Sequence, residues 1–212
     1  MLRRPWPWVL ALMLLAQAAQ PAIVFKAASS AAAAGNTTIS FRSTGAVASA
    51  NNGNLKARLP AAALGEMFFC QVSSRDNVAH SMPAGWTLAY SLTSSATLRA
   101  SLFYKISAAS EINPLITHPG GGRILSRCTR FRGVDPSNPL DVAIAAQYAT
   151  NSATVASGSL STLSSNDMLL FTAHLTANPN APASLGTPAG WTRPYYSRVT
   201  SNAIGLHYRT QA

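Results

Sequence analysis

Charged residues are scarce in this sequence: Asp, Glu, Lys and Arg make up 10% of its 212 residues, against 48% hydrophobic residues. That hydrophobic share excludes a disordered chain, and the shortage of charge excludes a solvated helical bundle. Beyond the first 35 residues no stretch of ten carries a clean apolar stripe at the helical period, and residues 143–149 allow about one helical turn at most. Ser, Thr, Ala, Gly and Asn fill the polar positions and suit strands and turns. These deficits predict an all-β protein.

The ingredients of hydrolytic catalysis are also missing. There is no Gly-x-Ser-x-Gly nucleophile elbow. A glycosidase needs two carboxylates facing one cleft, but the chain has only six acidic residues, most of them at expected turns. His118, followed by Pro and three glycines, superficially resembles an oxyanion-hole loop, but without a nucleophile it predicts a glycine turn. We therefore expect no enzyme, no catalytic residue and no cofactor; a periplasmic hydrolase is the weakest alternative.

Metal-ligand spacing is absent as well. No two histidines stand at the sequence spacing of metal ligands, the four being His80, His118, His174 and His207. We predict no metal site. One alternative stays open, because Asp135, Asn138 and Asp141 lie on one loop and could offer oxygen ligands to Ca²⁺; ordinary turn hydrogen bonding is the competing interpretation.

There are only two cysteines, Cys70 and Cys128, and each lies in a largely apolar run. Exported chains seldom leave paired thiols free, so we predict a Cys70–Cys128 disulfide. The alternative is two separate buried thiols.

The first residues read as a secretory leader. Arg3 and Arg4 form a basic start, residues 8–16 form an uncharged apolar run, and small residues follow at the spacing of a cleavage site, with Ala18 and Ala22 as candidate ends. The alternative is an uncleaved anchor, because apolar character continues weakly to residue 25.

We predict a signal peptide at 1–22, a small-residue linker at 23–35 and one β domain at 36–212, with no transmembrane helix after cleavage. Such a protein is exported to the periplasm, cell surface or medium.

Without Arg3 and Arg4 the chain keeps 14 basic residues against 6 acidic ones. A basic surface can meet anionic glycans, lipid headgroups or nucleic acid, and export disfavours nucleic acid. Four arginines cluster shortly after the middle of the chain, at Arg123, Arg127, Arg130 and Arg132. The simplest interpretation is a solvated strand face.

An internal repeat organises the domain. Pro-Ala-Gly-Trp-Thr occurs at 83–87 and again at 188–192. Upstream, a turn pair opens an apolar run in both copies, at 65–69 and 166–170; downstream, Leu-Phe-Tyr-Lys at 102–105 parallels Leu-His-Tyr-Arg at 206–209. Three ordered matches indicate a shared structural plan. Short strands separated by Gly and Pro turns predict a two-sheet antiparallel sandwich, jelly-roll-like, in which each half-repeat contributes to both sheets.

The aromatic residues divide into two sets. The repeated ones are expected to be structural anchors in the core, and they are Trp86, Trp191, Tyr104 and Tyr208. Sugar stacking is the alternative role for these rings. Tyr90, Tyr195 and Tyr196 follow the tryptophans on loops or strand ends, and we expect them to be exposed, as candidate ligand contacts.

This ordered set of motifs resembles a bacterial and phage surface β-sandwich module. Its members carry a Pro-x-Gly-Trp-Thr turn, a Tyr-Tyr-Lys-like strand, a Tyr-x-Gly-Val-Asp turn and a second Pro-x-Gly-Trp/Met-Thr turn, matched here at 83–87, 102–105, 131–135 and 188–192. The resemblance implies a surface-exposed or virion-associated module with no defined activity and no catalytic residues to transfer.

The sequence departs from that pattern at its end. Members continue past the second aromatic strand, whereas this chain stops shortly after it. We therefore expect a sandwich that lacks one strand, with an open edge beside Trp191 or Tyr208. Either the chain is a less stable fragment, or a partner supplies the strand.

The function hypothesis is a non-catalytic exported module, structural or adhesive, whose partners are envelope or appendage proteins or glycans. A phage tail or virion protein is the alternative, disfavoured by the leader.

Overall fold

The computed structural model describes residues 17–25, 38–94, 96–141, 144–149, 166–177 and 181–210. All regular structure in these ranges is β. Among these residues no helix could cross a membrane. The strands, in chain order, are β1 Gln17–Phe25, β2 Ser40–Thr44, β3 Ala48–Ala50, β4 Leu55–Lys56, β5 Met67–Ser74, β6 Thr87–Ser94, β7 Leu98–Ile106, β8 Leu115–Ile116, β9 Ile124–Arg132, β10 Ala145–Ala149, β11 Met168–Thr176, β12 Thr192–Val199 and β13 Asn202–Thr210.

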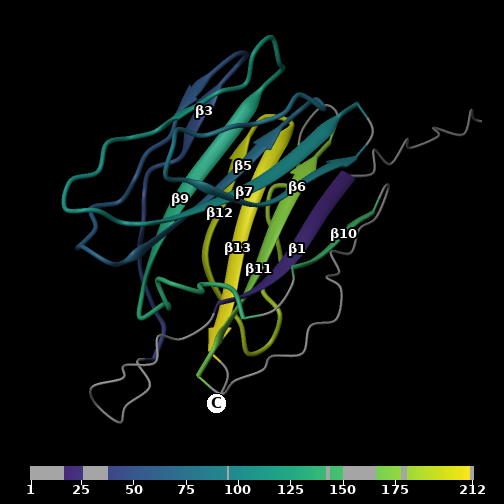
Figure 1. The fold of residues 1–212 in the computed structure, drawn as a ribbon. Helices are drawn as coiled ribbons and strands as arrows, with labels where there is room; N and C mark the ends of the chain where they lie inside the picture. The colour runs from purple at the N-terminus through teal and green to yellow at the C-terminus, as the bar shows by residue number, and fades with distance from the viewer. Residues whose placement is uncertain are drawn as a thin grey trace, which may run out of the picture.

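Two antiparallel sheets pack face to face (Figure 1). The first has the order β2-β9-β5-β7-β6, with β3 also on β9; the second has the order β10-β1-β11-β13-β12. The predicted all-β, two-sheet antiparallel sandwich is confirmed. Residues 145–149, where one helical turn was conceivable, instead form strand β10.

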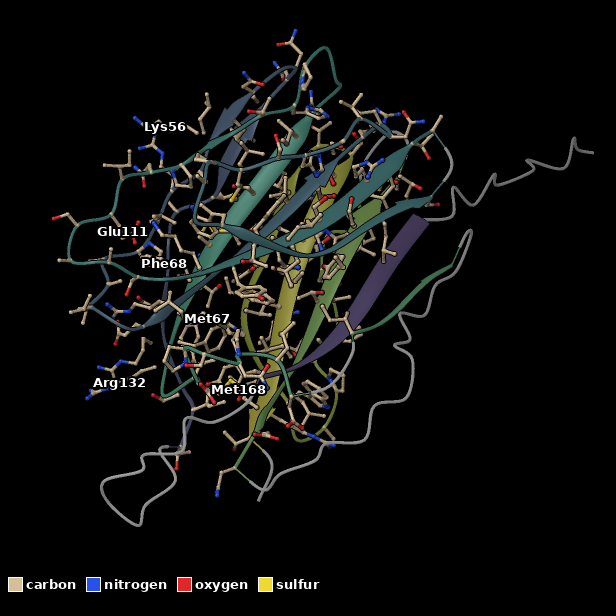
Figure 2. All side chains as sticks on the ribbon, viewed as in Figure 1. Lys56, Met67, Phe68, Glu111, Arg132 and Met168 are labelled. Atoms are coloured by element: carbon tan, nitrogen blue, oxygen red, sulfur yellow. A yellow bond between two sulfur atoms is a disulfide. The ribbon has the colours of Figure 1, made fainter. Side chains whose placement is uncertain are left out.

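The core lies between the sheets. Alternate residues of β5 point inward, so Met67 and Phe69 meet Met168, Leu170 and other buried side chains of the second sheet. Met67 and Met168 occupy equivalent positions of the two copies and lie at the same end of the molecule (Figure 2). The inward faces of both half-repeats thus bury each other, which is what holds the sandwich together.

The outer face of the first sheet is covered by a third layer. Leu55 and Ile116, from the small β4–β8 pair, are buried against the outward residues of β5. The predicted disulfide is present in this layer: Cys70 and Cys128 pair directly across β5 and β9, with Cα atoms 4.0 Å apart and both side chains buried. The bond therefore fastens two neighbouring strands of one sheet.

The repeat is visible in the topology, but each copy forms strands of one sheet only, so the expectation that each half-repeat contributes to both sheets is wrong. In the first sheet β5, β7 and β6 are neighbours in that order, and in the second sheet β11, β13 and β12 are neighbours in the same order. The tight turns before β6 and β12 also match, because Gly85 and Gly190 have φ angles of 89° and 77°, which favour glycine.

Trp86 and Trp191 follow these turns at equivalent places. Trp86 stacks on Phe68, with ring centroids 6.2 Å apart, and Trp191 meets Phe171 edge-on at 6.3 Å. Both are partly buried rather than largely buried. Each tryptophan covers the outer face of its own sheet. The two therefore occupy equivalent positions, as expected, but they are less buried than expected.

The expected open edge beside the last strand is wrong. β13 is paired on both sides, with β11 and with β12. In the first sheet the other edge of β5 is covered by β9, and in the second sheet the corresponding edge of β11 is covered by β1. The strand missing from the end of the second copy is therefore supplied from the start of the chain (Figure 1, purple beside green).

The predicted leader and linker meet within this strand. Residues 1–16 lie outside the described part of the chain, while 17–25 belong to β1, so the second sheet begins before the expected domain boundary at 36.

Candidate functional site

Two of the three tyrosines expected on the surface are buried. Tyr90 is 8% exposed and Tyr195 is 4% exposed. Each follows an irregularity where its strand has one residue more than its partner, between Leu88 and Tyr90 and between Thr192 and Tyr195. Such a bulge reverses which face the next side chain takes, and here it turns both rings into the core. The expectation of exposed rings is therefore wrong for this pair. Tyr196 is partly buried, and its hydroxyl donates to the Pro182 carbonyl.

Both tyrosines reach across the sandwich to equivalent positions. The Tyr90 hydroxyl lies 3.0 Å from Thr172 Oγ1 of β11, in the opposite sheet. The Tyr195 hydroxyl donates to Gln71 Oε1 of β5, and Gln71 is the counterpart of Thr172 in the repeat. Each copy thus sends one tyrosine hydroxyl to the central strand of the other. Burial raises the pKa of both phenols, so both stay protonated.

The hydrogen bonds that join the two sheets converge on the buried side chain of His174. His174 Nε2 lies 2.7 Å from the Tyr90 hydroxyl and 3.4 Å from Gln71 Nε2. The Gln71 amide nitrogen can only donate, and it also donates to the Gly205 carbonyl, so His174 Nε2 must act as an acceptor. The imidazole is accordingly neutral, and burial lowers its pKa to about 3.

Replacing Tyr195 by Phe is expected to lower the free energy of unfolding by about 1–3 kcal/mol, because the buried Gln71 Oε1 loses its donor. Tyr90→Phe is expected to cost a similar amount. Urea unfolding followed by tryptophan fluorescence measures both. Tyr208→Phe is the matched control, because that ring stacks on Phe41 in the core and only its hydroxyl is removed. A Tyr195→Phe midpoint equal to that of the parent protein would contradict the assigned role.

A second polar cluster lies at one end of the first sheet. His80 Nδ1 is 2.9 Å from Ser101 Oγ, and its Nε2 is 2.9 Å from Ser74 Oγ. Ser74 in turn donates to Asp76, which also accepts from His118 Nε2 at 3.0 Å. The His118 ring is buried and lies against Gly121, where a Cβ atom would stand 2.0 Å from it. The glycine run after His118 begins with a turn, as predicted, and the missing side chain of Gly121 leaves room for the imidazole.

The charges in this cluster are set by its hydrogen bonds. Burial alone would raise the pKa of Asp76, but the bonds from His118, Gly122, Val78 and Ser74 outweigh it and lower that pKa. Burial, with the neighbouring His118, lowers the pKa of His80 to about 3. The geometry does not fit a nucleophilic triad, because Ser101 is fully buried and the hydrogen bonds of Asp76 run to His118 and Ser74.

An open pocket of about 410 Å³ lies where two sequence motifs meet. The turn at Gly65 and Glu66 forms one wall, and the turn at Arg132, Gly133 and Val134 forms the other. Glu66 is the one carboxylate in the lining, and Arg130 neutralises it across 3.2 Å. A single paired carboxylate beside an exposed arginine does not provide the two carboxylates of a glycosidase.

The clustered arginines separate in space. Arg130 pairs with Glu66 and Arg132 borders the pocket, whereas the Arg127 guanidinium points into the sandwich and lies 4.6 Å from the centre of the Tyr195 ring. The interpretation as a solvated strand face therefore fails for Arg127.

The remaining predicted residues take structural positions. Tyr104 and Tyr208 pack against the core, as repeated anchors were expected to do. Asp135 Oδ1 accepts hydrogen bonds from the backbone amides of Ser137 and Asn138. This is the ordinary turn hydrogen bonding that was the alternative to a Ca²⁺ site. Within the described residues no group of three or more potential metal ligands is found.

Sequence reasoning missed the polar layer inside the core. Its signals were Gln71 and His174, each a polar residue within an apolar strand, because a buried polar group in such a place needs a partner from another strand. The inward turn of Tyr195 also had a signal, since Pro194 inside a strand marks a bulge or an edge.

Comparison of the chain with protein families, with curated proteins and with solved structures finds no match. The resemblance carried by the motifs therefore stays a hypothesis.

Proposed function

We propose that this chain is a non-catalytic structural module of an exported surface assembly. The observation that supports it is the placement of the reactive side chains. His80, His118 and His174 are buried and bonded within the fold, and the tyrosines that could have stacked on sugars hold the two sheets together. The disulfide is compatible with an oxidising compartment.

A structural role accounts for the aromatic residues better than a sugar-binding one. Carbohydrate stacking needs exposed ring faces, but Tyr90 and Tyr195 are in the core. Trp86 lies against Phe68, and the Arg209 guanidinium lies 5.3 Å from the centre of the Trp191 ring. Interlocked sheets, a cross-strand disulfide and a third layer suit a component that bears load.

Fractionation of the native host combined with surface cross-linking tests the proposal. We expect the chain in the exported fraction, with Cys70 and Cys128 protected from alkylation until reduction. Lys56 is exposed on the outer layer (Figure 2), so a membrane-impermeant amine cross-linker is expected to trap high-mass complexes. Lys56→Arg keeps the charge but removes the amine, and is expected to weaken that cross-linking. A cytosolic chain with free thiols would contradict export, and an exported chain that never cross-links would contradict assembly.

A further inference from the structure

The first strand occupies a position that the repeat assigns to a later strand. β1 lies beside β11 as β9 lies beside β5, in the same direction and in the same register. Three pairs of the first sheet show this, because each has a counterpart in the second sheet. Met67↔Phe131 corresponds to Met168↔Phe25, Cys70↔Cys128 corresponds to Phe171↔Ala22, and Ser74↔Ile124 corresponds to Leu175↔Ala18. The register agrees at both ends and near the middle of the strand, so β1 completes the second sheet as β9 completes the first.

The same strand contains both candidate ends of the leader. Cleavage after Ala18 leaves residues 19–25, which keep the pairing of Ala19 with His174 and those of residues 22–25 with residues 168–171 of β11. Cleavage after Ala22 leaves only residues 23–25. It also removes every pairing between β1 and β10, because that ladder runs from Ala18 to Ala22.

Without β1, the exposed edge of β11 would destabilise the fold and favour aggregation. The backbone N–H and C=O groups of β11 would lose their partners on one side, and an open edge invites pairing with other chains. The two candidate cleavage sites, which the leader pattern does not distinguish, therefore have opposite consequences for the fold.

Accepting the export on which the proposed function rests, we infer that the leader is removed after Ala18 and that residues 19–25 remain as the strand that completes the second sheet. The occupant of the position between β10 and β11 is this chain's own mature N-terminus.

N-terminal sequencing of the exported protein from its native host tests the processing site. A chain that begins at Ala19 supports the inference. A chain that begins at Ile23 or later overturns it while leaving export intact. An unprocessed chain in the cytosol overturns the proposed export instead, so the two failures are distinguishable.

Disulfide trapping tests the position of the strand. Because Ala22 pairs with Phe171 as Cys128 pairs with Cys70, the full chain carrying Ala22→Cys and Phe171→Cys is expected to form a second disulfide within one molecule. Ala19→Cys with Phe171→Cys is the control, since Ala19 pairs with His174 instead. Non-reducing electrophoresis and mass spectrometry of tryptic peptides measure the bond.

Each outcome of the trapping decides the question. A monomer with the second disulfide supports the inference, a disulfide-linked dimer shows that the strand comes from a second copy, and no bond shows that β1 is elsewhere; the last two overturn it. Phe171 packs against Trp191 and His207, so its replacement is expected to reduce the folded yield. The pair Ile23→Cys and Leu170→Cys tests the same register one residue further along.

Discussion

Removing the Cys70–Cys128 disulfide is expected to lower the free energy of unfolding by about 4 kcal/mol, by the loop-entropy model for cysteines 58 residues apart. The reason is that the bond restricts the unfolded chain, in which β5 and β9 would otherwise separate freely. The double variant Cys70→Ala, Cys128→Ala, unfolded in guanidinium, measures the effect. Because both cysteines are fully buried, a reductant is expected to act on the parent protein only once it unfolds.

A packing variant separates the bond from the contacts around it. Val72 lies two pairings further along the same ladder, opposite Ser126, and Val72→Ala removes buried apolar volume without changing connectivity. Its cost is expected to be the same in the oxidised protein as in the cysteine-free background. Equal midpoints for the parent protein and the double alanine variant would refute the stabilising role of the disulfide.

Acid is expected to destabilise the domain strongly between pH 6.5 and pH 3. His80 and His174 have a folded-state pKa of about 3 against 6.5 when unfolded, so across this interval the unfolded chain binds protons that the folded chain does not. Stability is therefore fully present above pH 6.5 and falls as the pH drops. The loss is up to about 1.4 kcal/mol per pH unit for each histidine, or about 5 kcal/mol for both at pH 4.5.

Replacing His174 isolates its contribution to the pH dependence of the free energy of unfolding. His174→Gln is expected to lower stability at neutral pH but to reduce the slope of unfolding free energy against pH by up to half, because it removes one of the two histidines whose folded-state pKa is about 3. Thr93→Ala, at an exposed position of β6, is the control and is expected to keep the parent slope. Urea unfolding at pH 7.5, 6.0, 5.0 and 4.5 provides the measurement. An unchanged slope in His174→Gln would contradict the neutral buried imidazole.

Features encoded in local patterns could be predicted from the sequence. The repeated Pro-Ala-Gly-Trp-Thr turns located β6 and β12, and the apolar aromatic run located β7 at Leu98–Ile106. The two cysteines admitted one pairing within the chain, which made the disulfide predictable as well. In each case neighbouring residues carry the information.

Features that depend on distant pairing could not be predicted in this way. Whether residues 17–25 become a leader end or a strand depends on β11, more than 140 residues later, whose edge they match in register. The inward turn of Tyr90 depends on one extra residue relative to β7, and nothing around Ala89 signals it. A strict two-residue alternation assigns such a side chain to the wrong face.

The crossing of Tyr90 and Tyr195 gives the interior of this chain the character of a symmetric dimer. In an isologous interface residue i of one subunit meets residue j of the other, and j of the first meets i of the second. The two half-repeats meet in that way, with Tyr90 on Thr172 and Tyr195 on Gln71. Neither half can therefore bury its own apolar face, since each covers that face of the other and supplies its hydrogen-bond partners. Folding must bring both halves together before either is stable.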